Sequence, residues 1–249
     1  MGNFVGGIWG NQMLGDFQQF NDSLGAAMAQ FKVADGIFCS DNLFAWARNL
    51  SFLDDEKFMH AFAAHAASDL ENGIIWRTHI YIWCVEQALR RSGDLVECGC
   101  YKGTSVRIAC DYVDFQALRK KFYLYDLFEH DGAMPHHAMP EHGPELYAQV
   151  CERFRELPNV KVVRGRIPEI FGQVCPKKIA FLHLDLNHVD AELGALEALF
   201  DRVVPGGLIL LDDYGWLPYR MQKLAEDKFF AARGLRPVEL PTGQGLVLA

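Results

Sequence analysis

The sequence predicts an α/β fold, with a mostly parallel sheet covered by helices on both faces and a helical region before it. Two observations lead to this prediction. After Gly93, short apolar runs alternate with stretches of helical periodicity, and strands that alternate with helices form parallel sheets. Before Gly93, apolar residues recur every three or four positions, as on one face of a helix. We therefore expect an N-terminal helical cap over residues 1–92, packed on a core over residues 93–249 as one folded unit.

Helical spacing marks the front region from Asp41 to Arg91. The apolar sets with this spacing are Leu43, Trp46 and Leu50, then Phe58 and Phe62, then Ile82, Val85 and Leu89. The spacing predicts helices over this segment. The many aromatic residues of the region are consistent with a substrate pocket and equally with a subunit interface, so self-association stays open.

Five strands are expected in the core. Their apolar runs cover residues 95–98, 122–125, 160–163, 179–184 and 208–211. The tail from Pro237 to Ala249 reads as two further short strands around the turn Thr242–Gly245. All of these runs have the length and the bounding turns that are typical of strands.

The connection from Glu129 to Pro144 has no apolar period. It carries three Pro, two Gly and four His, namely His130, His136, His137 and His142. Long connections without secondary structure are often functional, so we expect a lid. A metal site built on these histidines is the less favoured alternative, because Pro and Gly separate them.

Composition excludes several classes of partner. The net charge is −8 and the basic residues are scattered, so no continuous positive surface for nucleic acid is expected. No apolar run approaches the roughly 20 residues of a membrane span. Seven Cys, several of them inside apolar stretches, indicate reduced thiols and a cytoplasmic location.

The first predicted strand leads into a turn, from Glu97 to Ser105, that suits a bound cofactor. Gly99 and Gly103 allow a close backbone approach, and the following helix offers free N–H groups. A dinucleotide site prefers the pattern G-x-G-x-x-G, which is incomplete here. An acid two residues before the first Gly suits a cationic amino-acid group, such as that of S-adenosylmethionine (SAM). An ordinary strand-to-helix turn is the structural alternative.

Asp126 ends the second predicted strand, where a carboxylate can accept hydrogen bonds from both hydroxyls of a ribose. This feature fits NAD and SAM equally. The candidate cofactor-binding residues are Glu97, Gly99, Tyr101, Lys102, Gly103, Thr104, Ser105, Asp126, Arg166 and Asp185.

Three further carboxylates follow the fourth and fifth predicted strands. Asp185, Asp212 and Asp213 should meet in one crevice, because the carboxyl ends of parallel strands share one edge of the sheet. Clustered carboxylates repel each other unless a cation compensates, and oxygen ligands suit Mg²⁺. Taken one at a time, each Asp is as well explained as a cap or a solvated residue.

Asp185 and His188 are the candidate catalytic residues. His188 lies three residues after Asp185, where a neutral imidazole could take a proton from a hydroxyl group. A surface or core histidine without chemistry is the alternative.

Taken in order, these motifs resemble the macrocin O-methyltransferase family of SAM-dependent enzymes, which act on sugar hydroxyls in natural-product pathways. The resemblance covers about Asp94 to Gly215 and, more weakly, Thr242–Gly245. The matching pieces are Val96–Gly103, Tyr125–Phe128, His183–Asp185, and Pro205–Gly207 running to Asp212–Gly215.

The resemblance implies a Rossmann-like class I methyltransferase fold, SAM as methyl donor and usually Mg²⁺. It places Glu97, Gly99 and Gly103 on the methionine part of SAM and Asp126 on the ribose. It also implies that Asp185, Asp212 and Asp213 bind the metal ion, and that the metal ion anchors two neighbouring oxygens of the substrate. Family members often carry Asp and Tyr where this chain has Asn187 and His188.

The sequence thus predicts a Mg²⁺-dependent O-methyltransferase acting on a hydroxyl of a sugar or another small-molecule natural product. One alternative is a nicotinamide-dependent oxidoreductase, against which the missing third Gly argues. Another is a catalytically silent relative that acts as a binding or scaffolding subunit. Intact Glu97, Asp126 and Asp185 argue against that reading.

Overall fold

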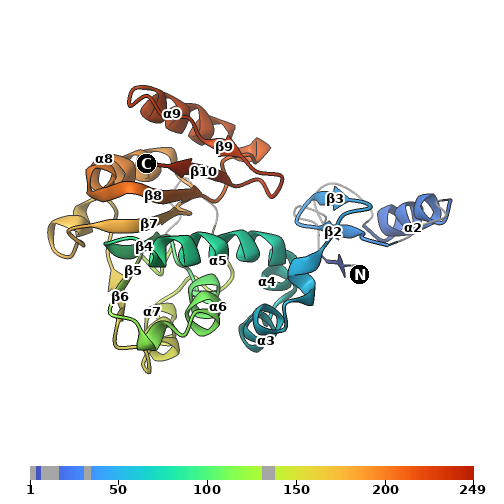
Figure 1. The fold of residues 1–249 in the computed structure, drawn as a ribbon, viewed down its shortest axis with the longest axis horizontal. Helices are drawn as coiled ribbons and strands as arrows, with labels where there is room; N and C mark the ends of the chain where they lie inside the picture. The colour runs from blue at the N-terminus through green and yellow to red at the C-terminus, as the bar shows by residue number, and fades with distance from the viewer. Residues whose placement is uncertain (1–3, 7–16, 31–34, 131–137) are drawn as a thin grey trace. The chain divides into compact units, whose positions relative to one another are not determined.

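A seven-stranded sheet forms the larger of two units into which the chain divides, Ile80–Ala249, in the computed structural model (Figure 1). The structure describes residues 4–6, 17–30, 35–130 and 138–249. The strand order is β6-β5-β4-β7-β8-β10-β9. The first five are parallel: β4 (Asp94–Cys98), β5 (Phe122–Asp126), β6 (Val160–Arg164), β7 (Ile179–Leu184) and β8 (Val203–Leu211).

The last two strands form a hairpin that closes one edge of the sheet. β10 (Gly245–Leu248) runs antiparallel to both β8 and β9 (Val238–Glu239). All five predicted core strands and both tail strands are confirmed, and β8 begins five residues earlier than its apolar run. The central strands are continuous apolar runs because a parallel sheet is buried on both faces; every residue of β7, for example, is buried.

Helices on both faces bury the sheet. The helices of this unit are α6 (Thr104–Tyr112), α7 (Leu146–Arg153), α8 (Val189–Leu199) and α9 (Arg220–Ala231), with α5 (Ile75–Leu89) crossing the boundary between the units. Short 3₁₀ turns lie at η2 (Phe115–Ala117), η3 (Glu169–Gly172), η4 (Phe200–Arg202) and η5 (Leu217–Tyr219).

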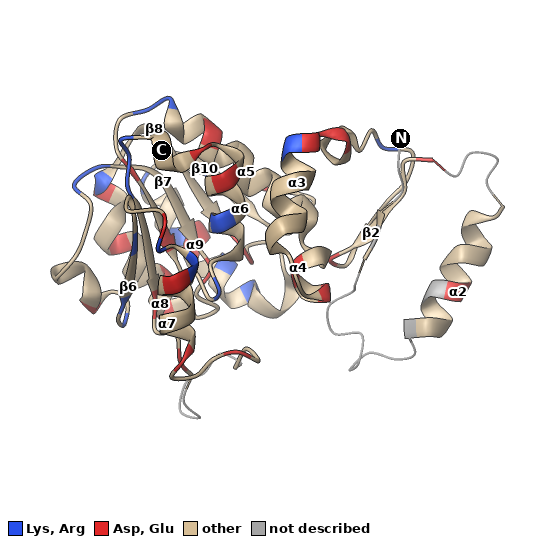
Figure 2. Cartoon of the chain, turned by 90° about the horizontal axis from the view of Figure 1, so that it is seen from below, with Lys and Arg blue, Asp and Glu red and all other residues tan. Residues whose placement is uncertain are grey.

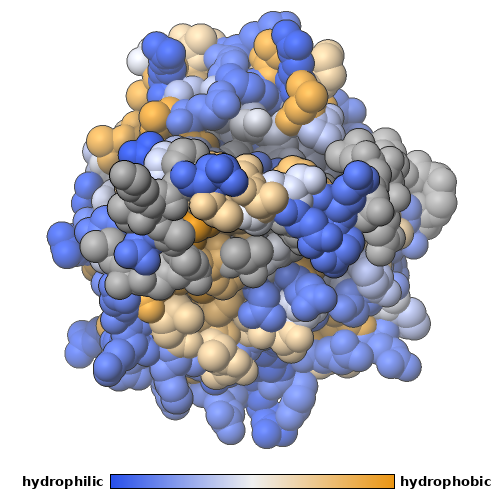
Figure 3. All heavy atoms as spheres, turned by 90° about the vertical axis from the view of Figure 1, so that its right-hand side faces the viewer, coloured by the Kyte–Doolittle hydropathy of each residue, from blue (hydrophilic) through white to orange (hydrophobic). Residues whose placement is uncertain are grey.

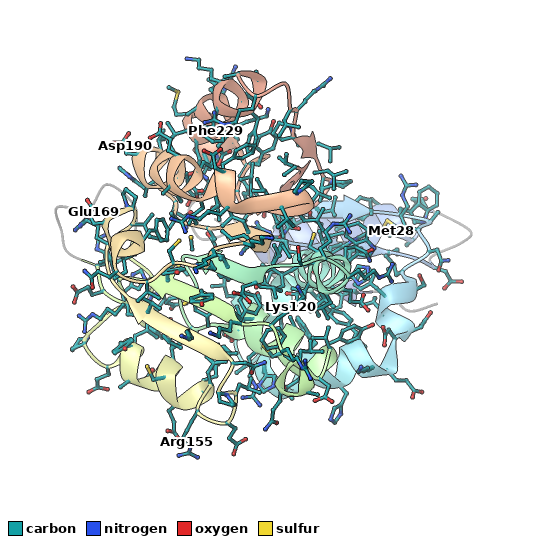
Figure 4. All side chains as sticks on the ribbon, turned by 60° about the vertical axis from the view of Figure 1, so that its left-hand side comes forward. Met28, Lys120, Arg155, Glu169, Asp190 and Phe229 are labelled. Carbon is teal, nitrogen blue, oxygen red and sulfur yellow. The ribbon has the colours of Figure 1, made fainter. Side chains whose placement is uncertain are left out.

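Successive side chains along each strand point to opposite faces of the sheet, so the apolar side chains pack against different helices on the two faces. Val96, Leu182 and Ile209 belong to a cluster that includes residues of α8 and α9, where Phe229 (Figure 4) contacts Phe200 with ring centroids 5.6 Å apart. On the opposite face, Tyr81 of α5 lies edge-on to Phe181 at 5.2 Å. Residues two apart on a strand therefore face the same helices.

The other unit, Met1–His79, contains a small sheet and short helices. Its elements are β1 (Phe4–Val5), α2 (Phe17–Met28), β2 (Phe38–Ser40), β3 (Leu43–Ala45), η1 (Ser51–Asp54), α3 (Glu56–His65) and α4 (Asp69–Gly73). β1 pairs with β2 in parallel, and β2 pairs with β3 antiparallel.

The predicted helices are confirmed from Ser51 onward, but the helical prediction is wrong before it. Leu43 lies on a strand, because Asp41 and Asn42 have φ values of 52° and 55° and turn the chain from β2 into β3. Asp41 is held in this turn by a buried ion pair with Arg77, with Nε and Oδ2 2.6 Å apart. A strand of three residues is too short to show a hydrophobic period in the sequence.

The described surface mixes charged, polar and apolar residues. Figure 2 shows Lys and Arg interspersed with Asp and Glu along the ribbon of the larger unit. All seven cysteines are free thiols. None of the described helices is both long and apolar enough to cross a membrane. Figure 3 shows hydrophobic atoms among hydrophilic ones on one face; in the smaller unit Phe20, Phe44 and Trp46 are notably exposed.

Candidate active site

A pocket of about 200 Å³ lies at the carboxyl ends of β4, β5, β6 and β7. Loops after these strands supply its lining, as expected for an open parallel sheet. Of the predicted site residues, the pocket brings together Gly99, Tyr101, Asp126, Arg166, Asp185 and His188. It is also lined by Leu127, Glu129, Met139, His142, Gly165, Ile167, Leu186, Asn187 and Ala191, which were not predicted.

The turn after β4 is shaped by its glycines. Gly99 has a φ of +87°, and a Cβ there would lie 1.8 Å from the backbone oxygen of Asp185. Gly103 has a φ of +69° and begins α6, and a Cβ there would lie 2.7 Å from the ring of Phe154. Both positions therefore require glycine for the fold itself. The close approach at Gly99 joins the turn directly to the loop after β7.

Asp126 forms the polar centre of the pocket. Its Oδ2 accepts a hydrogen bond from the amide of Tyr101 (2.7 Å) and its Oδ1 accepts one from the amide of Phe128 (2.7 Å). Burial raises the pKa of Asp126 from 3.8 to about 6. The carboxyl group is thus ionised at neutral pH, with each oxygen keeping capacity to accept one more donor from a ligand.

Residues 138–144 approach the pocket from the predicted lid. The amide of Glu141 donates to the hydroxyl of Tyr101 (3.1 Å), and the Glu141 carboxylate pairs with Lys102 (3.4 Å). The ring of His142 lies edge-on to Tyr101, with centroids 5.3 Å apart, and it stacks on His130 at 6.2 Å. These contacts place the described end of the connection beside Tyr101, and the lid itself stays a prediction; His136 and His137 lie outside the described residues.

Asp185 and His188 line the pocket from the loop after β7. Asp185 Oδ1 accepts a hydrogen bond from the side-chain amide of Asn187 (3.2 Å). His188 is the N-cap of α8, where its Nδ1 accepts a hydrogen bond from the amide of Ala191 (3.3 Å). A neutral imidazole that accepts at Nδ1 carries its proton on Nε2, so His188 has no free basic nitrogen in this arrangement.

Glu97 is buried behind the turn, where it contacts two side chains that were not predicted. Its Oε2 accepts a hydrogen bond from the Tyr81 hydroxyl and lies 3.3 Å from Nδ1 of His183. Nε2 of His183 lies 3.5 Å from Oδ1 of Asp212, which also accepts a hydrogen bond from Nε2 of Gln244 (3.0 Å). Burial lowers the pKa of His183, but Glu97 and Asp212 together outweigh it and raise this pKa well above the usual range.

The three carboxylates predicted to bind metal have different surroundings in the structure. Asp185 lines the pocket, whereas Asp212 pairs with His183 and Gln244. Asp213 is buried; burial raises the pKa of Glu192 on α8 and of Glu226 on α9, and the charge of Asp213 adds to that rise. β8 ends at Leu211, and both Asp212 and Asp213 lie in the turn that follows it. Throughout the described part of the chain, no three His, Cys, Asp or Glu side chains are placed to hold a metal ion.

The remaining predicted residues lie beside the pocket. The Thr104 hydroxyl accepts a hydrogen bond from Arg153 Nη1 (3.0 Å), and Ser105 lies in the first turn of α6. Glu97, Lys102, Gly103, Asp212 and Asp213 are likewise outside the lining. His183 could have been singled out from the sequence, because it is the one polar residue in the apolar run Ile179–Leu184.

Comparison with known proteins bears on the function. Residues 96–214 match a family described as a methyltransferase domain. No curated protein matches the chain significantly.

Three solved structures illustrate the likeness of fold. The O-methyltransferase NovP is 20% identical, covers 70% of this chain and 79% of its own, and has a TM-score of 0.59. CalS11, a TDP-rhamnose 3′-O-methyltransferase of calicheamicin biosynthesis, is 14% identical over 93% of each chain, with a TM-score of 0.51. A putative caffeoyl-CoA O-methyltransferase from Staphylococcus aureus is 9% identical over 70% of this chain and 82% of its own, with a TM-score of 0.51. The Rossmann-like class I methyltransferase fold is therefore confirmed.

Proposed function

We propose that this chain, which carries a methyltransferase domain on a class I methyltransferase fold, transfers a methyl group from SAM to a hydroxyl oxygen of a small molecule. The observation that carries the proposal is the pocket itself. It combines an ionised Asp126, the backbone of Gly99 and a second carboxylate, Asp185, at adjacent strand ends. This arrangement offers acceptors for ribose hydroxyls beside a group that can receive a proton.

The residues present fit SAM. Asp126 keeps two acceptor positions for the ribose, while Gly99 allows the backbone to approach the ligand closely. Arg166 and Ile167 line the pocket after β6 and would contact the adenine. Glu97 is two residues before Gly99, and its carboxylate would favour the cationic amino-acid end. When bound, SAM supplies an electrophilic methyl group on sulfur, and the protein contributes mainly alignment.

The acceptor hydroxyl must lose a proton, and Asp185 is placed to take it. Asp185 lines the pocket from the loop after β7, and its Oδ1 accepts a hydrogen bond from the side-chain amide of Asn187. His188 would serve as a base only if its capping bond to Ala191 opened. We therefore assign proton acceptance to Asp185 and helix capping with acceptor contact to His188.

The proposal that the reaction depends on Mg²⁺ rests on the resemblance described above and on the carboxylates that follow β7 and β8. The carboxylates do not fit a shared metal centre as they stand, so we derive no catalytic step through a metal ion. The rate of methyl transfer, measured with added Mg²⁺ and with a chelator, tests whether the reaction depends on the metal ion.

A sugar hydroxyl is the acceptor class that we propose. It follows from the resemblance to sugar O-methyltransferases, and CalS11 is described as acting on TDP-rhamnose. Asn187, His188 and His142 line the pocket with polar groups suited to hydroxyls.

The test is a methyl-transfer assay with isotopically labelled SAM and a panel of free sugars, nucleotide sugars, glycosylated polyketides and phenols. The proposal predicts label on an oxygen of at least one member, located by mass spectrometry and NMR. Transfer only to nitrogen or carbon would contradict it. Binding of SAM without transfer to any member would favour the catalytically silent alternative.

A further inference from the structure

Five side chains from five segments form a continuous polar chain behind the pocket. Tyr81 of α5, Glu97 of β4, His183 of β7, Asp212 after β8 and Gln244 before β10 follow one another in contact. Thr242 extends it, because its hydroxyl donates to Gln244 Oε1 (3.0 Å). None of these side chains lines the pocket.

The register of the sheet creates this chain. Glu97 and His183 are directly opposite each other on the parallel strands β4 and β7, so their side chains leave the sheet on the same face. Tyr81 covers them from α5, with its ring 5.0 Å from that of His183. Tyr81, Glu97 and His183 are only 2%, 4% and 4% exposed, so water does not screen the charges among them.

His183 occupies the centre of the chain, with one carboxylate on each side. Its Nδ1 faces Glu97 at 3.3 Å and its Nε2 faces Asp212 at 3.5 Å. Glu97 lies on β4 and Asp212 follows β8, the two strands on either side of β7, so each ring nitrogen of His183 faces one carboxylate. Removing the imidazole would leave the buried Glu97 carboxylate without this neighbour.

We infer that His183 is a positioning residue that fixes Glu97 at the cofactor turn and thereby sets the affinity for the amino-acid end of SAM. The inference rests on the proposed function. Glu97 is two residues before Gly99, which lines the pocket, so a displaced Glu97 carboxylate changes the turn that the cofactor contacts. His183 itself touches no ligand and acts through Glu97.

The test is a double-mutant cycle on the affinity for S-adenosylhomocysteine, measured by calorimetry without added metal. His183→Phe puts another aromatic ring beside Tyr81 and Phe181 but removes both ring nitrogens that face the carboxylates. We expect it to weaken binding at least tenfold in the wild-type background and less than threefold in a Glu97→Gln background. Thermal unfolding of each variant verifies that it is folded, and His183→Gln serves in the same cycle if His183→Phe does not fold.

A merely structural role would give the same fold-change in both backgrounds, and that result would overturn the inference. So would a change of less than twofold in the wild-type background. Adenosine, which lacks the amino-acid end, is the matched control ligand and should lose less than threefold on either His183 substitution. If the unaltered chain binds no S-adenosylhomocysteine, the proposed function fails; if it binds and the cycle shows no coupling, only this inference fails.

Discussion

The stability of the larger unit should fall with rising pH because of one buried carboxyl group, Glu226. Glu226 lies on α9 and has no exposed surface, and among the described residues neither of its carboxylate oxygens has a hydrogen-bond partner. Glu192 of α8 is equally buried, and it accepts a hydrogen bond from the amide of Leu186 in the pocket lining (2.8 Å). Burial, with Asp227 and Asp213 adding to it, raises the pKa of Glu226 from 4.5 to about 8.

The sign and size of the effect follow from this shift. In the folded chain Glu226 keeps its proton up to about pH 8, whereas in the unfolded chain the proton leaves near pH 4.5. The stability contributed by the protonated group is therefore complete below pH 4.5 and is lost as the pH rises toward 8. At about 1.4 kcal/mol for each pH unit in this window, the loss approaches about 5 kcal/mol.

Glu226→Gln removes the titration while keeping the shape of the side chain. The free energy of unfolding, measured in urea at pH 5, 7 and 9, should decline with pH in the wild type and much less in the variant. At pH 9 the variant should be the more stable by at least about 2 kcal/mol. Glu156→Gln, at an exposed position, is the matched control and should follow the wild type. Identical pH profiles for wild type and Glu226→Gln would refute the reasoning.

Two further predictions concern the pocket. Gly99→Ala should destabilise the fold by about 3 kcal/mol or more, because the position has a φ of +87° and an added Cβ would overlap the Asp185 carbonyl oxygen; a melting temperature equal to that of the wild type would contradict this. The affinity for S-adenosylhomocysteine should fall as the pH drops below about 6, because protonation of Asp126 removes an acceptor, and Asp126→Asn should bind at least tenfold more weakly without that pH dependence. A wild-type affinity that is constant from pH 5 to 8 would count against the assigned role of Asp126.

The sheet was predictable because its signals are local. Each core strand is a mainly apolar run bounded by Gly, Pro or charged residues. The turn after β4 is indicated in the sequence by Gly99 and Gly103. Strand-end position was enough to bring Asp126 and Asp185 into one pocket. The short strands β2 and β3 were not predicted, because they depend on a left-handed turn at Asp41 and Asn42 and show no hydrophobic period in the sequence.

The partners of Glu97 and Asp212 were not predictable, because they depend on register between distant segments. Glu97 meets Tyr81 and His183 only through the packing of α5 and the pairing of β4 with β7. The surroundings of Asp212 and Asp213 were not predictable either, because both lie in the turn after β8, where strand alternation does not fix the direction of a side chain. The contribution of His142 to the pocket depends on the path of a long connection, which composition alone does not determine.

The most direct test of the central claim is calorimetric titration of the purified chain with S-adenosylhomocysteine, with and without Mg²⁺. The account predicts one site with a dissociation constant on the order of 1 µM, in which Asp126 contributes to affinity in either condition. Absence of binding under both conditions would contradict the claim that this pocket receives SAM.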